Sequence, residues 1–179
     1  MTQFDPILQS APELQPYLLD ADHIDVKTVE GKATMREFLA GMFSYCPGWL
    51  KFLYGVRWGF VRLLGMKQEG IPESHEYRPE DVCMTPGEAM AFFTVEMASE
   101  RVWLAGIVDT HLSANVGIVR EALENGRFRF HIITIVHYNK WTGVVYFSVI
   151  RPFHHLVVAQ MAKSGVNYTK SGTLVRGEL

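Results

Sequence analysis

The segment 127–163, RFRFHIITIVHYNKWTGVVYFSVIRPFHHLVVAQMAK, contains two different patterns in succession. Its first part, 127–139, is a long run of β-branched and aromatic side chains, which is typical of a β-strand. Thr142-Gly143 then opens a second part, from about Val144 to Lys163, which is long enough for a helix. A long helix that directly follows a long strand predicts a sheet packed against that helix.

Three more β-rich runs precede this stretch. They are 91–98, 102–111 and 116–123. Short segments separate them, at Ser99-Glu100 and Ser113-Ala114-Asn115, and Asn125-Gly126 separates the third run from residue 127. Asn-Gly is a strong signal for a two-residue hairpin turn. Because parallel strands need long crossover connections, these short links predict an antiparallel meander.

The N-terminal half adds one strand and two helices. Residues 23–29 alternate with a period of two and predict the first strand. Thr34 and Glu37 fit a capping box, which predicts a helix from about Met35 to Tyr45. A second helix is expected over 49–64, closed by Gly65. The remaining segments are expected to be an extended N-terminal arm (1–20), a loop (66–87) and a mobile C-terminal tail (164–179).

This order of elements predicts an α+β fold in one domain, residues 1–179. A lone helix covers a face of a sheet only if the sheet curves around it. We therefore expect the helix-grip architecture, a curved antiparallel sheet wrapped around the long C-terminal helix, with two short helices after the first strand. An apolar cavity is expected between sheet and helix.

Composition favours a folded globular protein, with 48% apolar and 20% charged residues and a net charge of −2. Two cysteines suit a reducing compartment, and the N-terminus has no export signal, so we expect a cytoplasmic location. Apolar stretches of about ten residues are too short for stable membrane insertion. Residues 126–179 carry seven basic and one acidic side chain, interleaved with apolar residues, so no nucleic-acid partner is expected.

The helix over 49–64 carries two unusual side chains. Arg57 falls inside the apolar arc of this helix and needs a carboxylate, a carbonyl or an anionic ligand group as its partner. Trp58 lies beside Lys51 and Arg62. It could stand at a cavity mouth, touch a membrane surface, pack on a dimer partner or contact the N-terminal arm.

Histidines and one aspartate supply the other candidates. His154 lies on the apolar arc of the C-terminal helix, whereas Arg151 and His155 share a stripe assigned to solvent. Asp109 and His111 are two apart on an expected strand, so they form either an acid–base pair or the start of a turn. His131 and His137 share a strand face, but no spacing is diagnostic of a metal site, and no phosphate or dinucleotide motif occurs. Neither a metal nor a cofactor is expected.

Several stretches together resemble the family called domain of unknown function 2867. They are Ala21–Asp25, Arg57 with Leu64–Met66, Asp109–Leu112 and Arg151–His154, and the most specific part is Tyr146–His154. This family resembles the START-like (SRPBCC) superfamily, whose members share the helix-grip fold and often hold lipids or other hydrophobic molecules. The resemblance implies pocket positions at Asp109, His111, Arg151 and His154, without an assigned activity.

Three functions stay open. The leading hypothesis is binding of a hydrophobic small molecule or lipid in the cavity. A second is an enzyme of the cyclase or hydratase kind, with His111 or His154 as acid–base and Arg57 facing an oxyanion. A third is an interaction module, such as a homodimer, that uses the Trp58 edge. The candidate ligand-binding residues are Trp49, Phe52, Arg57, Trp58, Trp103, Asp109, His111, Phe130, Ile132, Arg151, Phe153, His154 and Met161.

Overall fold

The computed structural model describes residues 5–63 and 75–168. Within these residues six strands form one antiparallel sheet, in the order β1-β6-β5-β4-β3-β2. The strands are β1 (His23–Gly31), β2 (Ala89–Met90), β3 (Phe93–Ala98), β4 (Val102–Val108), β5 (Leu112–Ala122) and β6 (Phe128–Tyr138). The helices are α1 (Asp5–Ser10), α2 (Gln15–Leu18), α3 (Met35–Phe43), α4 (Gly48–Leu63) and α5 (Trp141–Val166).

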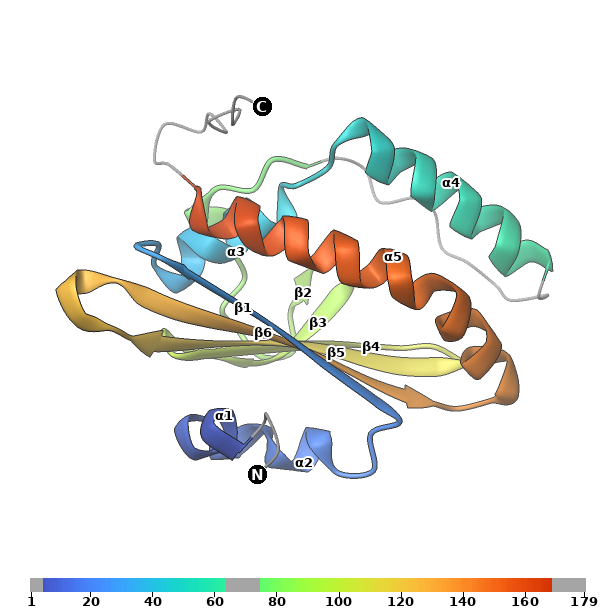
Figure 1. Cartoon of the computed structure of the whole chain (residues 1–179), viewed down its shortest axis with the longest axis horizontal. Helices are drawn as coiled ribbons and strands as arrows, with labels where there is room; N and C mark the ends of the chain where they lie inside the picture. The colour runs from blue at the N-terminus through green and yellow to red at the C-terminus, as the bar shows by residue number, and fades with distance from the viewer. Residues whose placement is uncertain (1–4, 64–74, 169–179) are drawn as a thin grey trace.

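The predicted architecture is confirmed. The strands bend around the long C-terminal helix α5, which lies across one face of the sheet, and two helices follow the first strand (Figure 1). The first strand pairs with the last, so that His23 lies opposite Val136 and Gly31 lies opposite Phe128. This long-range pairing brings β1 beside the strand that leads directly into α5.

The meander is confirmed, but two boundaries are wrong. The strand expected from residue 91 begins at Phe93, because Ala91 and Phe92 form the turn between β2 and β3. Ser113–Asn115 were expected to separate two strands, yet they belong to β5, where Ser113 pairs with Val108 of β4 and His137 of β6. The turn lies four residues earlier, at 109–111, where the Asp109 N–H donates to the Leu112 carbonyl. Asn125 and Gly126 have φ angles of 61° and 68°, as the expected hairpin requires.

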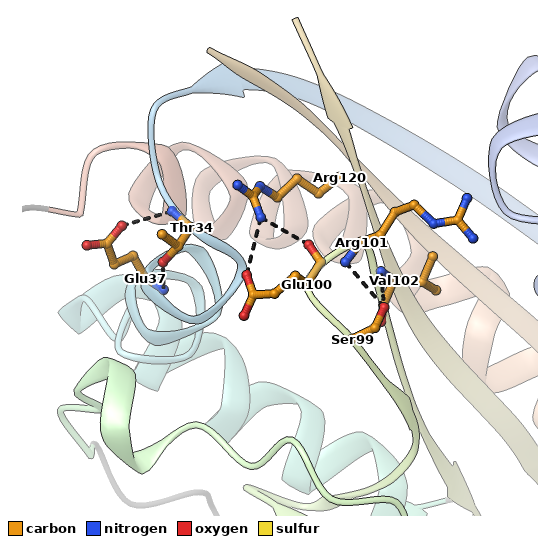
Figure 2. Close-up of polar contacts among 7 residues, drawn as sticks. All are labelled: Thr34, Glu37, Ser99, Glu100, Arg101, Val102 and Arg120. Carbon is orange, nitrogen blue, oxygen red and sulfur yellow. Dashed lines mark hydrogen bonds and ion pairs between the residues drawn. The ribbon is translucent and has the colours of Figure 1, made fainter. Parts of the chain in front are cut away.

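Local hydrogen bonds fix the connections at one end of the sheet (Figure 2). The Thr34 hydroxyl accepts from the Glu37 N–H while the Glu37 carboxylate accepts from the Thr34 N–H, which confirms the capping box. Between β3 and β4, the Ser99 hydroxyl accepts from the N–H groups of Arg101 and Val102. These bonds satisfy backbone donors that the turn and the helix start would otherwise leave unpaired.

The N-terminal segment is helical, which corrects the expected extended arm. Residues 5–18 form α1, a short 3₁₀ turn and α2. Prolines start the last two of these, because a fixed φ and a missing N–H suit the first helical turn. Ala11 and Leu14 are fully buried against the outer face of the sheet, the face opposite α5.

The main core lies between the sheet, α3 and α5. Phe38 of α3 stacks on Phe130 of β6 with ring centroids 4.2 Å apart. The helices α3 and α5 pack so closely that a Cβ at Gly165 would come within 2.7 Å of the Phe38 ring. Ser164 and Gly165 are buried in α5, so the expected mobile tail does not begin at 164. The rest of that tail from 169, residues 66–74 of the expected loop, and Leu64 and Gly65 at the end of the expected second helix lie outside the described residues.

Helix α4 packs on the helical layer. Its Val61 contacts a small cluster with Tyr146 and Ile150 of α5 and Leu112 of β5, and α4 lies on the far side of α5 from most of the sheet (Figure 1). Among the described residues, no helix combines the length and the apolar character that a membrane span requires.

Candidate functional site

A cluster of polar side chains lies between β1, β6 and α5. Side chains two apart on a strand share a face, and Val29 of β1 packs into the core under α5. His23, Asp25 and Lys27 therefore face α5 as well. In the register of the sheet, Asp25 lies beside Thr134 of β6.

Helix α5 supplies two adjacent histidines to this cluster. His155 Nδ1 lies 2.9 Å from Asp25 Oδ2, and His154 Nε2 lies 3.3 Å from the Thr134 hydroxyl. Lys27 Nζ donates to Asp25 Oδ1 over 3.1 Å. We call His23, Asp25, Thr134, His154 and His155 the histidine cluster.

Aromatic contacts pack the three imidazole rings together. The His23 ring lies 4.9 Å from the Phe147 ring and 5.9 Å from the His155 ring, between centroids. His154 lies 6.0 Å from Phe147 and 6.4 Å from His155. Phe147 itself is almost fully buried, so one side of the histidine cluster is apolar.

Burial sets the charge state of the cluster. Burial lowers the pKa of His154 to about 4, and the nearby charge of His155 adds to this effect. Burial also lowers the pKa of His23. Burial acts to raise the pKa of Asp25, but hydrogen bonds from Lys27 and His155 outweigh it and hold this pKa below its usual range. At neutral pH the cluster thus combines an ionised carboxylate with neutral imidazoles at His23 and His154.

One buried nitrogen of the cluster has no partner among the described residues. His23 Nε2 is buried and makes no hydrogen bond within the part of the chain that the structure describes. A neutral imidazole has one donor and one acceptor nitrogen, and buried polar atoms in folded proteins are almost always paired. The cluster can therefore offer one further hydrogen bond to a bound group.

No metal site accompanies the cluster. Among residues 5–63 and 75–168, no three His, Cys, Asp or Glu side chains are arranged to hold an ion. His131 and His137 lie on the opposite face of the sheet, where His131 meets Thr28 and His137 meets the Tyr17 carbonyl.

Three of the predicted ligand-binding residues belong to the protein's own core. Trp103, Phe130 and Ile132 are fully buried in the cluster that contains α3. Trp103 Nε1 donates to the Cys83 carbonyl, so its polar atom is also satisfied. Helix α3 fills this end of the space between sheet and α5, where a cavity was expected.

The predicted residues of α5 divide between its two faces. His154 faces the sheet, and Met161 is half-buried against the main core. Phe153, which was expected to line the cavity, lies instead on the outer face with 49% of its surface exposed. Arg151 is exposed, as expected, but His155 is not a solvent residue because it reaches Asp25.

The predicted residues of α4 lie away from the histidine cluster. Trp49, Phe52 and Trp58 are exposed, with 71% of the Phe52 surface accessible, so they do not line the space under α5. Arg57 has a partner that the sequence did not predict. Its Nε donates to the Tyr146 hydroxyl over 2.5 Å, and the guanidinium carbon lies 5.6 Å from the centre of that ring.

Asp109 and His111 belong to the β4–β5 turn, the second of the two expected alternatives. The Asp109 carboxylate accepts the N–H of Thr110. His111 Nδ1 lies 2.6 Å from the Thr142 hydroxyl, and its carbonyl accepts from Asn139 and Lys140. These contacts anchor the start of α5. Thr142 and His154 are twelve residues apart, about 18 Å along a helix, so His111 is remote from His154.

Sequence reasoning missed four members of the site: His23, Asp25, Thr134 and His155. The alternation of residues 23–29 places His23 and Asp25 on one face, which was an available signal. The sequence does not show what lies beside that face, because Asp25 of β1 pairs with Thr134 of β6, more than one hundred residues later in the chain.

Comparisons with known proteins agree with the family suggested by the sequence. The model of the family described as "Protein of unknown function (DUF2867)" matches residues 15–161. No curated protein matches the chain.

Solved structures with a similar arrangement are distant in sequence. The hypothetical protein jhp0584 from Helicobacter pylori is 15% identical, with a TM-score of 0.44, over 87% of this chain and 94% of that one. Ara h 8.0201 is 8% identical, with a TM-score of 0.38, over 80% and 97%. Norcoclaurine synthase from Thalictrum flavum, in complex with dopamine and hydroxybenzaldehyde, is 11% identical, with a TM-score of 0.38, over 79% and 84%.

Proposed function

This chain belongs to the DUF2867 family, and we propose that it binds a hydrophobic small molecule that carries one uncharged polar group. The polar group lies at the histidine cluster and the apolar body lies along the inner face of α5. The expected location stays the cytoplasm, because Cys46 and Cys83 are both free thiols.

The observation that carries this proposal is the unpaired, buried His23 Nε2. Leaving such an atom without a partner costs about 1–3 kcal/mol. A ligand that supplies the missing hydrogen bond recovers this free energy on binding. Ligand sites in proteins are mostly apolar with a few placed polar groups, and Phe147 and Tyr138, whose rings lie 6.1 Å apart, supply the apolar side here.

The charge of the cluster favours a ligand with a hydroxyl or carbonyl group over an anionic ligand. The imidazoles of His23 and His154 are neutral at pH 7, since burial lowers the pKa of both. Two cations act on His23: Arg151, whose charge adds to the lowering of the His23 pKa, and Lys27, which is already paired with Asp25. An added carboxylate would lie close to the ionised Asp25, and like charges at such a distance repel.

The test is a matched ligand pair. Binding of 2-naphthol and naphthalene, and of 1-decanol and decanoate, is measured by isothermal titration calorimetry at pH 7. We expect each hydroxyl compound to bind at least about tenfold more tightly than its partner, the equivalent of one hydrogen bond. In the His23→Phe variant the preference disappears, whereas in the control His75→Phe, at an exposed position, it persists. Equal binding within each pair in the unmodified protein would refute the proposal.

A second candidate function is acid–base catalysis on the bound molecule. It is favoured by the 2.9 Å contact between His155 Nδ1 and Asp25, because a carboxylate that holds one imidazole nitrogen orients the other for proton transfer. The expected arrangement with Arg57 as an oxyanion partner finds no support, since Arg57 contacts Tyr146 instead. Turnover of a bound ketone that is lost in Asp25→Asn while binding is kept would establish catalysis; binding without turnover would exclude it.

A further inference from the structure

Several large apolar side chains of α4 are exposed. At 100° per residue, Phe52, Val56 and Trp49 follow one another around the side of α4 that turns away from Val61, and Trp58 lies across the basic stripe of Lys51 and Arg62. All four side chains are exposed, by 48% at Trp58 and 55% at Val56. Monomeric proteins rarely expose so many large apolar side chains together, and such faces mark interaction surfaces.

The neighbouring helix continues this pattern. Helix α5 exposes six large apolar side chains: Trp141, Val144, Val145, Val149, Phe153 and Leu156. Val61 of α4 packs against Tyr146 and Ile150 of α5, so the two exposed sets belong to one helical layer. This layer covers the side of the sheet opposite α1 and α2 (Figure 1).

The charge of this layer has a single sign. All 19 Asp and Glu residues of the chain lie outside α4 and α5. The two helices carry five cations: Lys51, Arg57, Arg62, Arg151 and Lys163. Lys51 and Arg62 flank Trp58, with the Arg62 guanidinium carbon 5.4 Å from the Trp58 ring. An apolar face with aromatic residues and basic flanks is the composition of helices that lie in a membrane interface.

We propose that α4, with the outer side of α5 beside it, docks on an anionic lipid bilayer. Phe52 and Val56 enter the boundary between headgroups and acyl chains, Trp49 and Trp58 lie at headgroup level, and Lys51 and Arg62 approach the lipid phosphates. A second copy of the chain fits this surface less well than an anionic bilayer does. In a symmetric dimer the same patch meets itself, which would bring the cations of both copies together with no carboxylate from either α4 or α5 between them.

The experiment is co-sedimentation of the whole chain with vesicles. The two compositions are phosphatidylcholine alone and phosphatidylcholine with 30% phosphatidylglycerol, at low and at physiological salt. We expect binding to the anionic vesicles that weakens with salt, and little binding to the neutral ones. No binding to either composition would overturn the proposal, as would light scattering that shows a dimer whose formation prevents vesicle binding.

Variants separate the electrostatic contribution to docking from the contribution of apolar burial. Lys51→Gln with Arg62→Gln should weaken binding to anionic vesicles about 30-fold, because each cation near such a surface contributes about a factor of five. Phe52→Ala should weaken it about tenfold or more through lost apolar burial. Phe92→Ala and Lys32→Gln, at exposed positions outside α4 and α5, are the matched controls and should bind as the unmodified chain does. Equal loss in the controls would contradict docking by this face.

Discussion

His155 Nδ1 of α5 lies 2.9 Å from Asp25 Oδ2 of β1. This contact joins the long helix to an edge strand of the sheet, and Lys27 binds the same carboxylate. Around it lie the neutral His154 and the unpaired nitrogen of His23. The pair thus connects the stability of the fold with a place where the described structure offers a buried, unused hydrogen bond.

Replacing Asp25 by Asn should destabilise the fold. The change removes the charge from the hydrogen bonds to His155 and Lys27, and charge-assisted hydrogen bonds contribute about 1.5–3 kcal/mol. Urea unfolding at pH 7 measures the loss. The control Asp20→Asn is exposed and should change the free energy of unfolding by less than about 0.5 kcal/mol. Equal effects of the two changes would show that the Asp25 carboxylate contributes no more to the free energy of unfolding than an exposed carboxylate does.

Stability should fall as the pH drops from 7 toward 4. The unfolded chain protonates His154 near its ordinary pKa of 6.5, whereas the folded chain does so only at about 4. Within this window the unfolded state binds more protons, so acid favours unfolding, by about 3 kcal/mol at most. His23 acts in the same direction, since its pKa is also lowered. The pKa of Asp25 is held below 3.8, so protonation of this carboxylate lowers the stability only below about pH 4.

The variant His154→Gln isolates the contribution of His154. Glutamine keeps a donor for the Thr134 hydroxyl but does not titrate. The slope of unfolding free energy against pH, taken from urea curves between pH 7 and 4.5, should become flatter. The exposed His75→Gln should leave the slope unchanged. An unchanged slope in His154→Gln would mean that His154 is not buried as a neutral group.

Replacement of glycine by alanine should have opposite effects on stability at two positions. Gly165→Ala would place a methyl group 2.7 Å from the Phe38 ring and 2.8 Å from the Phe38 carbonyl oxygen. Overpacking of this kind costs about 1–3 kcal/mol. At Gly59 of α4 nothing lies within 4 Å, so Gly59→Ala should leave stability unchanged or raise it by up to about 1 kcal/mol. Thermal unfolding compares them, and a neutral Gly165→Ala would contradict the close packing of α3 and α5.

Arg57 and Tyr146 should be coupled energetically. The guanidinium donates to the phenol oxygen and also lies near the ring. A double-mutant cycle with Arg57→Met and Tyr146→Phe should give a coupling free energy of about 1–2 kcal/mol, because each single change breaks the same hydrogen bond. Strictly additive effects on the free energy of unfolding would show that this contact does not hold α4 to α5.

The sequence predicted most of the fold because its signals are local. The alternation of residues 23–29, the capping box at Thr34 and the Asn125-Gly126 turn each act over a few residues, and each is found in the structure. Short connections then restricted the sheet to an antiparallel meander. The break expected at Ser113–Asn115 failed because small polar residues there are paired on both sides in the sheet, a tertiary effect that outweighs turn propensity.

The site was less predictable because it depends on which faces meet. His154 was correctly placed on the apolar arc, but the helical wheel put His155 in solvent. A wheel treats the partner surface as uniform, whereas α5 lies against β1, whose Asp25 reaches a side chain at the margin of the helix. Trp103 and Phe130 were expected in a pocket because they are large and apolar, and α3 covers them instead. Periodicity identifies a buried face but not what buries it.

Ligand binding at the histidine cluster can be followed by nuclear magnetic resonance of the histidine side chains. Protein labelled with ¹⁵N at histidine is titrated with 2-naphthol at pH 7, and the imidazole nitrogens are followed. We predict that Nε2 of His23 shows the largest change, with smaller changes at His154 and His155 and none at His75. Changes confined to histidines outside this cluster, or no change at saturating ligand, would contradict the proposal that the cluster binds the polar group of a hydrophobic molecule.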